Sequence, residues 1–165
     1  MRIMTPLPHP PRSTAEQARI DATIIEIFQE LISFNRVLGL EILSVRNGDV
    51  RARFAMRPEL VGHYAHGRLH GGVVSAVLDA MAGMALLAAI AERHPQDGPQ
   101  QLTQRFTHMG TIDLRVDFLR QGKGGHFTAT AEVTRLGGRI GSAQMRLLDE
   151  AGTLIATGAA SYVVA

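Results

Sequence analysis

The strongest constraint on the fold is one long apolar stretch, which runs from Gly71 to Ala91 and reads GGVVSAVLDAMAGMALLAAIA. It contains a single charged residue, Asp79, and the uncharged run that follows, Ala80–Ala91, is 12 residues long. A helix that crosses a bilayer needs about 20 apolar residues, and a carboxylate in the middle of the span is costly. The stretch therefore predicts a helix that is apolar on nearly all sides because the rest of a globular domain surrounds it.

Composition narrows the class of protein further. The chain has 165 residues, which fits a single domain, and it contains no cysteine, which excludes disulfides, cysteine-ligated metals and cysteine nucleophiles. A formal net charge of +2, without a block of like charges, argues against a nucleic-acid partner. Residues 1–12 hold four prolines and no apolar segment. We therefore expect a disordered leader at 1–12, one domain at 13–165, and a cytoplasmic protein without a membrane span.

The segment before the apolar stretch predicts a helix and a hairpin. Ser13 and Glu16 form a capping box, and the apolar residues behind them recur at helical spacing until Gly39. Two short strands, at about 40–45 and 50–56, are joined across Asn47-Gly48, which is a strong hairpin signal. The residues at 61–69 are then expected to form a loop that leads into the central helix.

Behind the central helix the apolar pattern changes its period. Residues 94–109 are polar and aperiodic and predict a loop with at most a helical turn. Residues 111–118 alternate strictly between polar and apolar, and three more strands follow, separated by glycine-containing turns. We expect these four strands to form a meander. The fold class is α+β: a long central helix wrapped by a curved antiparallel sheet of five to six strands, with an extra N-terminal helix.

The start of the central helix is a candidate for binding negative charge. His70 is followed by Gly71 and Gly72, and glycine at a helix end lets another group approach the backbone closely. The first N–H groups of a helix have no intrahelical partner, and the helix dipole adds positive potential there. Such an end can stabilise a carbonyl oxygen that becomes negative in a transition state. Tight packing of the helix against a sheet would require the same glycines.

Two further residues could take part in the same chemistry. Asp79 lies among apolar neighbours, and a buried carboxylate is costly unless it is paired or used. It follows Gly72 by seven residues, which returns it to the same helix face about 10.5 Å further along. If both act on one substrate, they must come from two chains with antiparallel helices; alternatively Asp79 is structural. Thr111 could hold a water for a carboxylate base, or could be an ordinary strand threonine.

These segments resemble the hotdog-fold acyl-CoA thioesterases, in particular those acting on phenylacetyl-CoA and hydroxyphenylacetyl-CoA. The resemblance rests on LHGGVVSAVLDAMAG (69–83), on GTIDLRVDFLR (110–120) and on the turn at Gly137-Gly138, and it covers roughly 40–164. It implies that the N–H of Gly71, with Gly72, polarises the thioester carbonyl. It also implies that Asp79 is the general base or nucleophile, that Thr111 positions the water, and that His70 orients the loop and substrate.

The chain departs from the family just before His70. Many relatives carry an asparagine there, whereas this chain has His63, Tyr64 and His66 within HYAH, and any of these could make the missing polar contact. The three histidines could in principle bind zinc, although two glycines loosen the segment and a fourth ligand is usual. We therefore expect no metal and no organic cofactor, since coenzyme A belongs to the substrate.

The remaining expectations concern the rest of the substrate and the assembly. Arg135 and Arg139 flank the Gly137-Gly138 turn, and we expect these four residues to bind substrate. Arg120 and Lys123 flank the turn at 122–125, and some of these four basic side chains should make charge-assisted contacts with the phosphates of coenzyme A. A free sheet edge predicts a homodimer or a dimer of dimers. The resulting hypothesis is an acyl-CoA thioester hydrolase. The alternatives are a non-catalytic acyl-CoA-binding module and an enoyl-CoA hydratase or dehydratase on the same scaffold.

Overall fold

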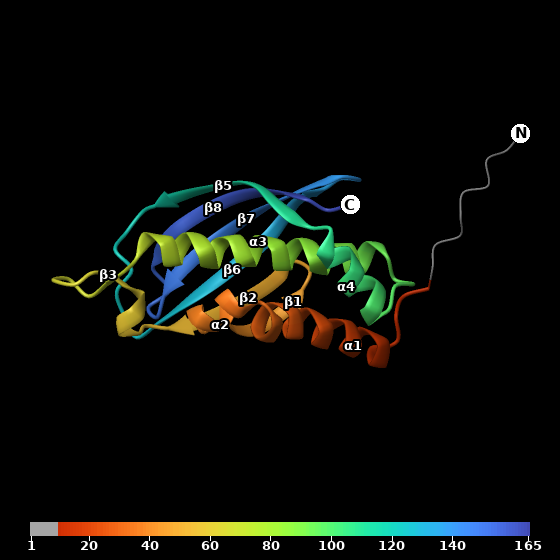
Figure 1. Cartoon of the computed structure of the whole chain (residues 1–165), viewed down its shortest axis with the longest axis horizontal. Coiled ribbons are helices and arrows are strands. Elements are labelled where there is room, and N and C mark those ends of the chain that lie inside the picture. Colours follow the sequence, from red (N-terminus) through yellow and green to blue (C-terminus); the bar gives the residue numbers. More distant parts are fainter. Residues whose placement is uncertain (1–9) are drawn as a thin grey trace, which may run out of the picture.

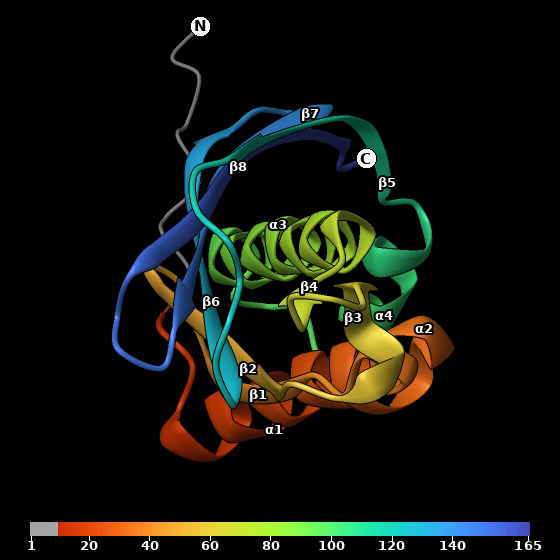
Figure 2. The same cartoon turned by 90° about the vertical axis from the view of Figure 1, so that its left-hand side faces the viewer.

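A single long helix runs through the molecule along the inner face of a curved sheet (Figures 1 and 2). The computed structural model describes residues 10–165, so most of the predicted leader lies outside the described residues. The helix is α3 (Gly71–Arg93), and every residue from Met81 to Ala91 is buried. It is long and apolar enough to span a membrane by length and composition alone, yet 72% of its most apolar window is buried within the domain. The prediction of a central core helix is confirmed.

The sheet has six antiparallel strands, which curve around α3 as the end-on view shows (Figure 2). Their order across the sheet is β1 (Glu41–Arg46), β2 (Asp49–Ala55), β6 (His126–Leu136), β7 (Ile140–Asp149), β8 (Leu154–Val163) and β5 (Gly110–Phe118). The predicted hairpin and all four later strands are present. Together with α3 and the N-terminal helix, they confirm the expected α+β hotdog architecture.

The predicted order of the last four strands is wrong in one respect. β5 does not pair with β6, as a meander would require, but lies at the edge of the sheet beside β8. The connection from β5 to β6 runs past the end of the sheet, where its backbone bonds with three other segments: Leu119 donates to Ile155, and the carbonyls of Gly122 and Gly125 accept from Leu69 and Met56. Because these partners are distant in sequence, alternation within each strand could not reveal this crossing.

The N-terminal helix is broken into three pieces. α1 (Thr14–Ile25) begins with the expected capping box between Ser13 and Glu16, and it continues as a π-helical segment, η1 (Glu26–Leu31). After a break at Ile32 the chain forms α2 (Ser33–Leu38). The buried Asn35 side chain donates to the carbonyl of Phe28 at 2.8 Å, which satisfies a backbone group that the break exposes. Gly39 ends α2 in the left-handed conformation, as expected of a helix stop.

Two segments expected to be loops contain regular structure. The polar segment after the central helix forms α4 (Pro99–Thr107). Pro99 occupies the first helical position, where proline favours the start of a helix and does not break it. Its Phe106 packs edge-on against Phe28, with ring centroids 5.4 Å apart. Ahead of α3, a 3-10 turn, η2 (Pro58–Leu60), leads into a small hairpin of β3 (Val61–His63) and β4 (Arg68–Leu69).

Arg12 attaches the start of the described chain to the far end of α3. Its guanidinium donates to the carbonyls of Ala91, His94 and Asp97, at 2.8, 2.7 and 3.1 Å. Although Arg12 is the last residue of the predicted leader, these bonds make it part of the packed domain. The bond to Ala91 also satisfies one of the last carbonyls of α3, which a helix C-terminus leaves without an intrahelical partner.

Candidate active site

The N-terminus of α3 offers one free backbone donor. His70 caps the helix: its Nδ1 accepts from the N–H of Gly72 at 2.8 Å, and its carbonyl accepts from Val73. The Gly72 N–H is therefore already bonded within the chain. Of the two glycines expected to bind the substrate carbonyl, only Gly71 has an N–H that is available. Among residues 10–165, no acceptor takes the N–H of Gly71. An unpaired helical N–H at a positive dipole end suits a developing oxyanion.

Glycines are required here because backbone and imidazole lie close together. A Cβ on Gly72 would lie 2.9 Å from Nδ1 of His70, so a side chain would displace the cap. A Cβ on Gly62, in β3, would lie 2.5 Å from the Cα of His70. The short hairpin thus holds His70 in place from outside. Gly62 was missed in the sequence, where nothing distinguishes it from other loop glycines.

A groove of about 420 Å³ opens beside Gly71. Arg68 from β4 and Arg120, just after β5, contribute positive charge to its lining, and the ring of Phe118 lies next to the glycine. The guanidinium of Arg120 also donates to the carbonyl of Leu154 at 3.0 Å, which ties it to the sheet. Arg68 was missed by the sequence reasoning, since a lone arginine in a predicted loop carries no signal.

Asp79 lies further along α3 and is hydrogen-bonded by two hydroxyl groups. Its Oδ1 accepts from Oγ1 of Thr111 at 3.0 Å and from the hydroxyl of Tyr162 at 2.6 Å. The structure thus brings Thr111 and Asp79 together within one chain, through a direct hydrogen bond. Burial and the neighbouring carboxylate raise the pKa of Tyr162 far above its usual range. Tyr162 was missed, because it lies in the last strand, outside any motif.

A β-bulge turns Thr111 toward the helix. The register between β5 and β8 shifts between Thr111 and Asp113, so Thr111 lies opposite Tyr162 while Leu114 lies opposite Ala160. Strict alternation from Leu114 would have pointed Ile112 inward and Thr111 outward. Instead Ile112 is 53% exposed, and the threonine reaches the carboxylate. Bulges commonly redirect a side chain in this way near functional sites.

Within one chain, the free donor and the carboxylate are separated. Gly71 and Asp79 are eight residues apart in α3, which corresponds to about 12 Å along the axis. A thioester carbonyl carbon must lie within about 3.5 Å of its attacking atom while its oxygen meets the donor. One chain therefore does not bring both groups to the same carbonyl.

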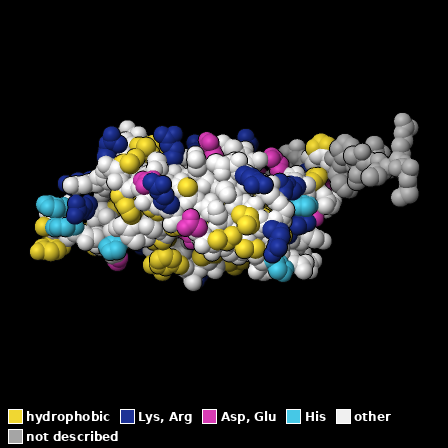
Figure 3. All heavy atoms as spheres, turned by 90° about the horizontal axis from the view of Figure 1, so that it is seen from above, with side chains coloured by type: hydrophobic (Ala, Val, Ile, Leu, Met, Phe, Trp, Pro, Cys, Tyr) yellow, Lys and Arg dark blue, Asp and Glu magenta, His cyan; other side chains and the backbone are white. Residues whose placement is uncertain are grey.

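Three predicted substrate-binding residues lie in the β3–β4 hairpin and the turn at its tip, which projects beyond the start of α3 (Figure 1) and forms the histidine-rich end of the surface (Figure 3). The rings of His63 and His66 stack with centroids 4.5 Å apart, and Tyr64 is 94% exposed. The Nδ1 atom of His63 is buried without a hydrogen-bond partner among the described residues. Nowhere in 10–165 do three or more His, Asp or Glu side chains form a group that could hold a metal ion.

The other four predicted substrate-binding residues lie at the opposite end of the helix. Gly137 and Gly138 form the turn between β6 and β7, and Arg135 and Arg139 flank it. Arg93, at the end of α3, donates to the carbonyl of Gly137 at 2.7 Å. This turn is thus about 33 Å along the helix axis from Gly71. Within one chain, the structure does not bring these four residues to the site.

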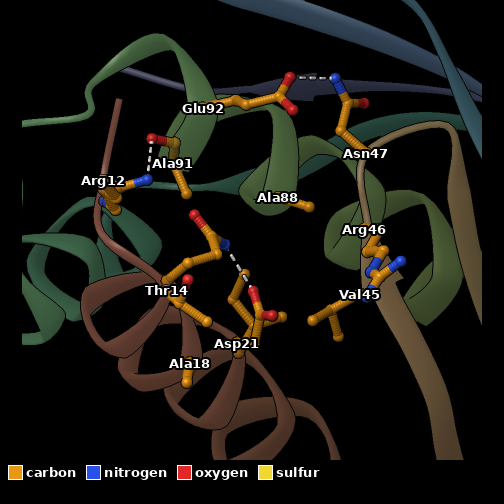
Figure 4. A pocket seen from close by; sticks show the side chains of 12 residues that line it. Arg12, Thr14, Ala18, Asp21, Val45, Arg46, Asn47, Ala88, Ala91 and Glu92 are labelled. Carbon is orange, nitrogen blue, oxygen red and sulfur yellow. Dashed lines mark hydrogen bonds between the residues drawn. The ribbon is translucent and has the colours of Figure 1, made fainter. Parts of the chain in front are cut away.

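A larger cavity of about 650 Å³ also lies toward that far end, between α1, the β1–β2 hairpin and α3 (Figure 4). Arg12 is bonded there to the carbonyl of Ala91, and Asn47 donates to Glu92 at 2.6 Å. The two carboxylates of this cavity, Asp21 and Glu92, each accept from a side-chain amide, and neither lies beside an unpaired helix N-terminus as Asp79 would in a shared site.

The chain matches the family model of the thioesterase superfamily over residues 66–156, which includes α3 and most of the sheet. It is 40% identical over 151 residues to a protein of Salmonella typhimurium named medium/long-chain acyl-CoA thioesterase YigI, covering 92% of this chain and 96% of that protein. The protein of the same name in Escherichia coli K12 is 39% identical over the same coverage. These names do not confirm the phenylacetyl-CoA type to which the motifs pointed.

Solved structures agree with the sequence relatives. A crystal structure from Shewanella oneidensis, described as related to the thioesterase superfamily, superposes with a TM-score of 0.85 at 37% identity, covering 93% of this chain and all of that one. Zebra fish thioesterase superfamily member 2 shares the fold, with a TM-score of 0.67 at 24% identity, covering 92% of this chain and 96% of that one. The family match and the relatives agree with the geometry around α3, and the chain belongs to the thioesterase superfamily.

Proposed function

We propose that this protein hydrolyses acyl-CoA thioesters of medium and long acyl chains, and that its active site forms between two copies of the chain. The substrate class is supported by the names of the two YigI relatives at about 40% identity. The observation that carries the mechanism is the carboxylate of Asp79, which two hydroxyls hold through Oδ1 only. A carboxylate fixed in this way, partly exposed on an otherwise apolar helix, is suited to act on a substrate.

Hydrolysis follows from the two groups described above. The carbonyl oxygen of the thioester accepts from the N–H of Gly71, which stabilises the negative charge that develops during attack. Asp79 takes a proton from the attacking water, or itself attacks to form an anhydride that water then opens. Collapse of the tetrahedral intermediate breaks the carbon–sulfur bond and releases coenzyme A as its thiolate, leaving the free acid. His70 holds the loop, and Thr111 holds the carboxylate.

A homodimer would bring the two groups together. Two α3 helices that pack antiparallel place Asp79 of one chain beside Gly71 of the other. β5 lies at the free edge of the sheet and exposes Ile112 and Phe118, at 53% and 58%. On another side, α2, which contacts α3, exposes Phe34 and Val37 at 57% and 60%. Exposed apolar residues around an open strand edge are typical of an interface with a second copy.

The proposed reaction uses no metal and no organic cofactor. In the dimer, the groove lined by Arg68 and Arg120 would receive part of the coenzyme A, whose phosphates attract guanidinium groups. Activity unchanged after treatment with a chelator is expected, and loss that only added metal restores would contradict this part. A cytoplasmic location and a dimer of dimers remain predictions.

The test is release of free thiol from a panel of acyl-CoAs, from acetyl to palmitoyl, with phenylacetyl-CoA included. We expect the highest kcat/KM with acyl chains of about eight carbons or more. Binding without thiol release would support the acyl-CoA-binding alternative. Loss of enoyl-CoA absorbance without thiol release would support a hydratase. A preference for phenylacetyl-CoA would overturn the proposed chain-length class while leaving hydrolysis intact.

A further inference from the structure

The hydroxyl of Tyr162 lies between two oxygens of the same aspartate. It is 2.6 Å from Oδ1 of Asp79 and 2.7 Å from the backbone carbonyl oxygen of Asp79. The tyrosine side chain comes from β8 and is buried, with the residue 7% exposed. One hydroxyl thus links the carboxylate to its own main chain, which restricts rotation of the aspartate side chain. Tyr162 is not needed for any step of hydrolysis proposed above.

The helix provides space for this ring at one position. Gly83 lies one turn beyond Asp79 on the same face of α3, and it is buried. A Cβ on Gly83 would lie 3.3 Å from Cε1 and 3.4 Å from the hydroxyl oxygen of Tyr162, and 3.5 Å from the ring of Phe28. The contact with Cε1 is tighter than usual and the other two are ordinary, so a side chain at this position would require the tyrosine ring to shift by a few tenths of an ångström.

The two hydroxyl donors act on one side of the carboxylate. Thr111 and Tyr162 are paired residues of β5 and β8, and both bond to Oδ1. Within residues 10–165 no donor reaches the other oxygen, Oδ2. This division leaves Oδ2 as the oxygen that can meet water or a thioester. The hydroxyl of Tyr162 lies against two acceptor oxygens, so it serves as a donor, and the raised pKa of its phenol agrees with that role.

We propose that Tyr162 is a positioning residue, which holds Asp79 by Oδ1 and presents Oδ2 to the substrate. The missing side chain at Gly83 leaves room in the helix for the ring of Tyr162. The inference rests on the proposed function, because it assigns a role relative to Asp79. It predicts that losing the hydroxyl harms the chemical step and leaves substrate binding unchanged. A purely structural tyrosine would affect the stability of the fold instead.

The first experiment compares Tyr162→Phe with Ser161→Ala in the full-length chain. Tyr162→Phe removes the hydroxyl and keeps the ring, and we expect kcat to fall about tenfold with KM changed by less than about twofold. Ser161→Ala removes a hydroxyl from the neighbouring position of the same strand, which faces away from α3, and kcat should stay within about twofold of wild type. A Tyr162→Phe enzyme with wild-type kcat would overturn the inference, as would a change confined to KM.

The second experiment is a double-mutant cycle with Gly83→Ala. The added methyl pushes the ring by a few tenths of an ångström and so lengthens the hydrogen bond from the hydroxyl to Asp79, and we expect kcat to fall about five- to tenfold in the wild-type background. In the Tyr162→Phe background the same substitution should change kcat by less than about twofold, because the hydroxyl that it displaces is already absent. Equal and additive losses in both backgrounds would show that Gly83 acts independently of the hydroxyl and would contradict the pairing.

Asp79→Asn separates this inference from the proposed function. An inactive Asp79→Asn enzyme together with a fully active Tyr162→Phe enzyme would reject the role of Tyr162 and leave the proposed mechanism in place. An active Asp79→Asn enzyme would reject the mechanism itself. Thermal unfolding of each variant shows whether the measured kcat belongs to folded protein, and the Gly83→Ala arm remains informative if Tyr162→Phe folds poorly.

Discussion

The two halves of α3 differ in what surrounds them, although both are almost entirely apolar in sequence. From Met81 to Ala91 every side chain is buried, and the far end is held by Arg12 and Arg93 through backbone carbonyls. From Gly71 to Ala80 the helix is only partly covered. That half carries the free N–H and the single carboxylate. One helix is thus a core element at one end and a candidate active site at the other.

The difference shows how a buried helix can supply chemistry without weakening the core. Polar groups in the covered half would need partners from the same chain, since an unpaired buried polar group costs several kcal/mol. In the open half, a donor and a carboxylate can remain available to substrate. The comparison predicts that substitutions at the two ends affect different measurements.

The largest effect is expected in the covered half. Leu87 is fully buried, and Leu87→Ala should lower the free energy of unfolding by about 2–5 kcal/mol through lost burial and a remaining cavity. Denaturant unfolding measures this change. kcat of the folded protein should stay within about twofold of wild type, and a large loss of kcat at unchanged stability would break the distinction between the two halves.

The next effect belongs to the open half. Asp79→Asn should lower kcat at least about 100-fold, which is about 2.7 kcal/mol in the activation free energy. Because the asparagine Oδ1 can still accept from Thr111 and Tyr162, the melting temperature should change by only a few degrees. Steady-state kinetics and thermal unfolding, measured on the same sample, test the two expectations. Retained turnover in this variant would end the proposed mechanism.

A smaller effect is expected at the strand that supports the carboxylate. Thr111→Val keeps the shape of the side chain and removes one of the two donors to Oδ1, so kcat should fall about tenfold. Thr134→Val, in which the lost hydroxyl bonds to the carbonyl of Ser142 in the sheet, is the matched control and should leave kcat unchanged. Equal losses in both variants would show a general effect of packing.

Most of the fold could be predicted because its signals are local. The apolar stretch, the capping box at Ser13 and the alternation of the later strands each depend on neighbouring residues. The order of the strands could not be predicted, because the connection from β5 to β6 is held by bonds to Ile155, Leu69 and Met56. α4 was missed because a polar segment that contains prolines resembles a loop. The sequence does not show that Pro99 lies at the first position of a helix, where proline is favourable.

The candidate site was predictable in part. Gly71 and Asp79 follow from the helix itself, whereas Thr111 depended on a family resemblance, because alternation alone points it away from the helix. Tyr162 could not be found in the sequence, since its role exists only through a strand pairing 51 residues away. The turn at Gly137 illustrates the opposite error: a basic glycine turn attracted a substrate role that its place at the far end of α3 does not support within one chain.

The central claim is that Gly71 of one chain and Asp79 of another act on one carbonyl. Gly71→Pro tests the donor, because proline is tolerated at the first helical position and replaces the N–H with a ring carbon; His70, with φ −68° and ψ 136°, already has the backbone conformation that precedes proline. We expect kcat to fall about 100-fold. Gly71→Ala keeps the N–H, and its Cβ would lie 3.5 Å from the Phe118 ring, an ordinary contact, so it is the control.

The most direct measurement is the activity of purified heterodimers that carry Gly71→Pro in one chain and Asp79→Asn in the other. If the site is shared, each heterodimer has one site with both defects and one intact site, so it should recover about half of the wild-type activity per dimer, although each homodimeric variant is nearly inactive. If each site lies within a single chain, both sites of the heterodimer remain defective. Heterodimers no more active than the parent variants would therefore contradict the account.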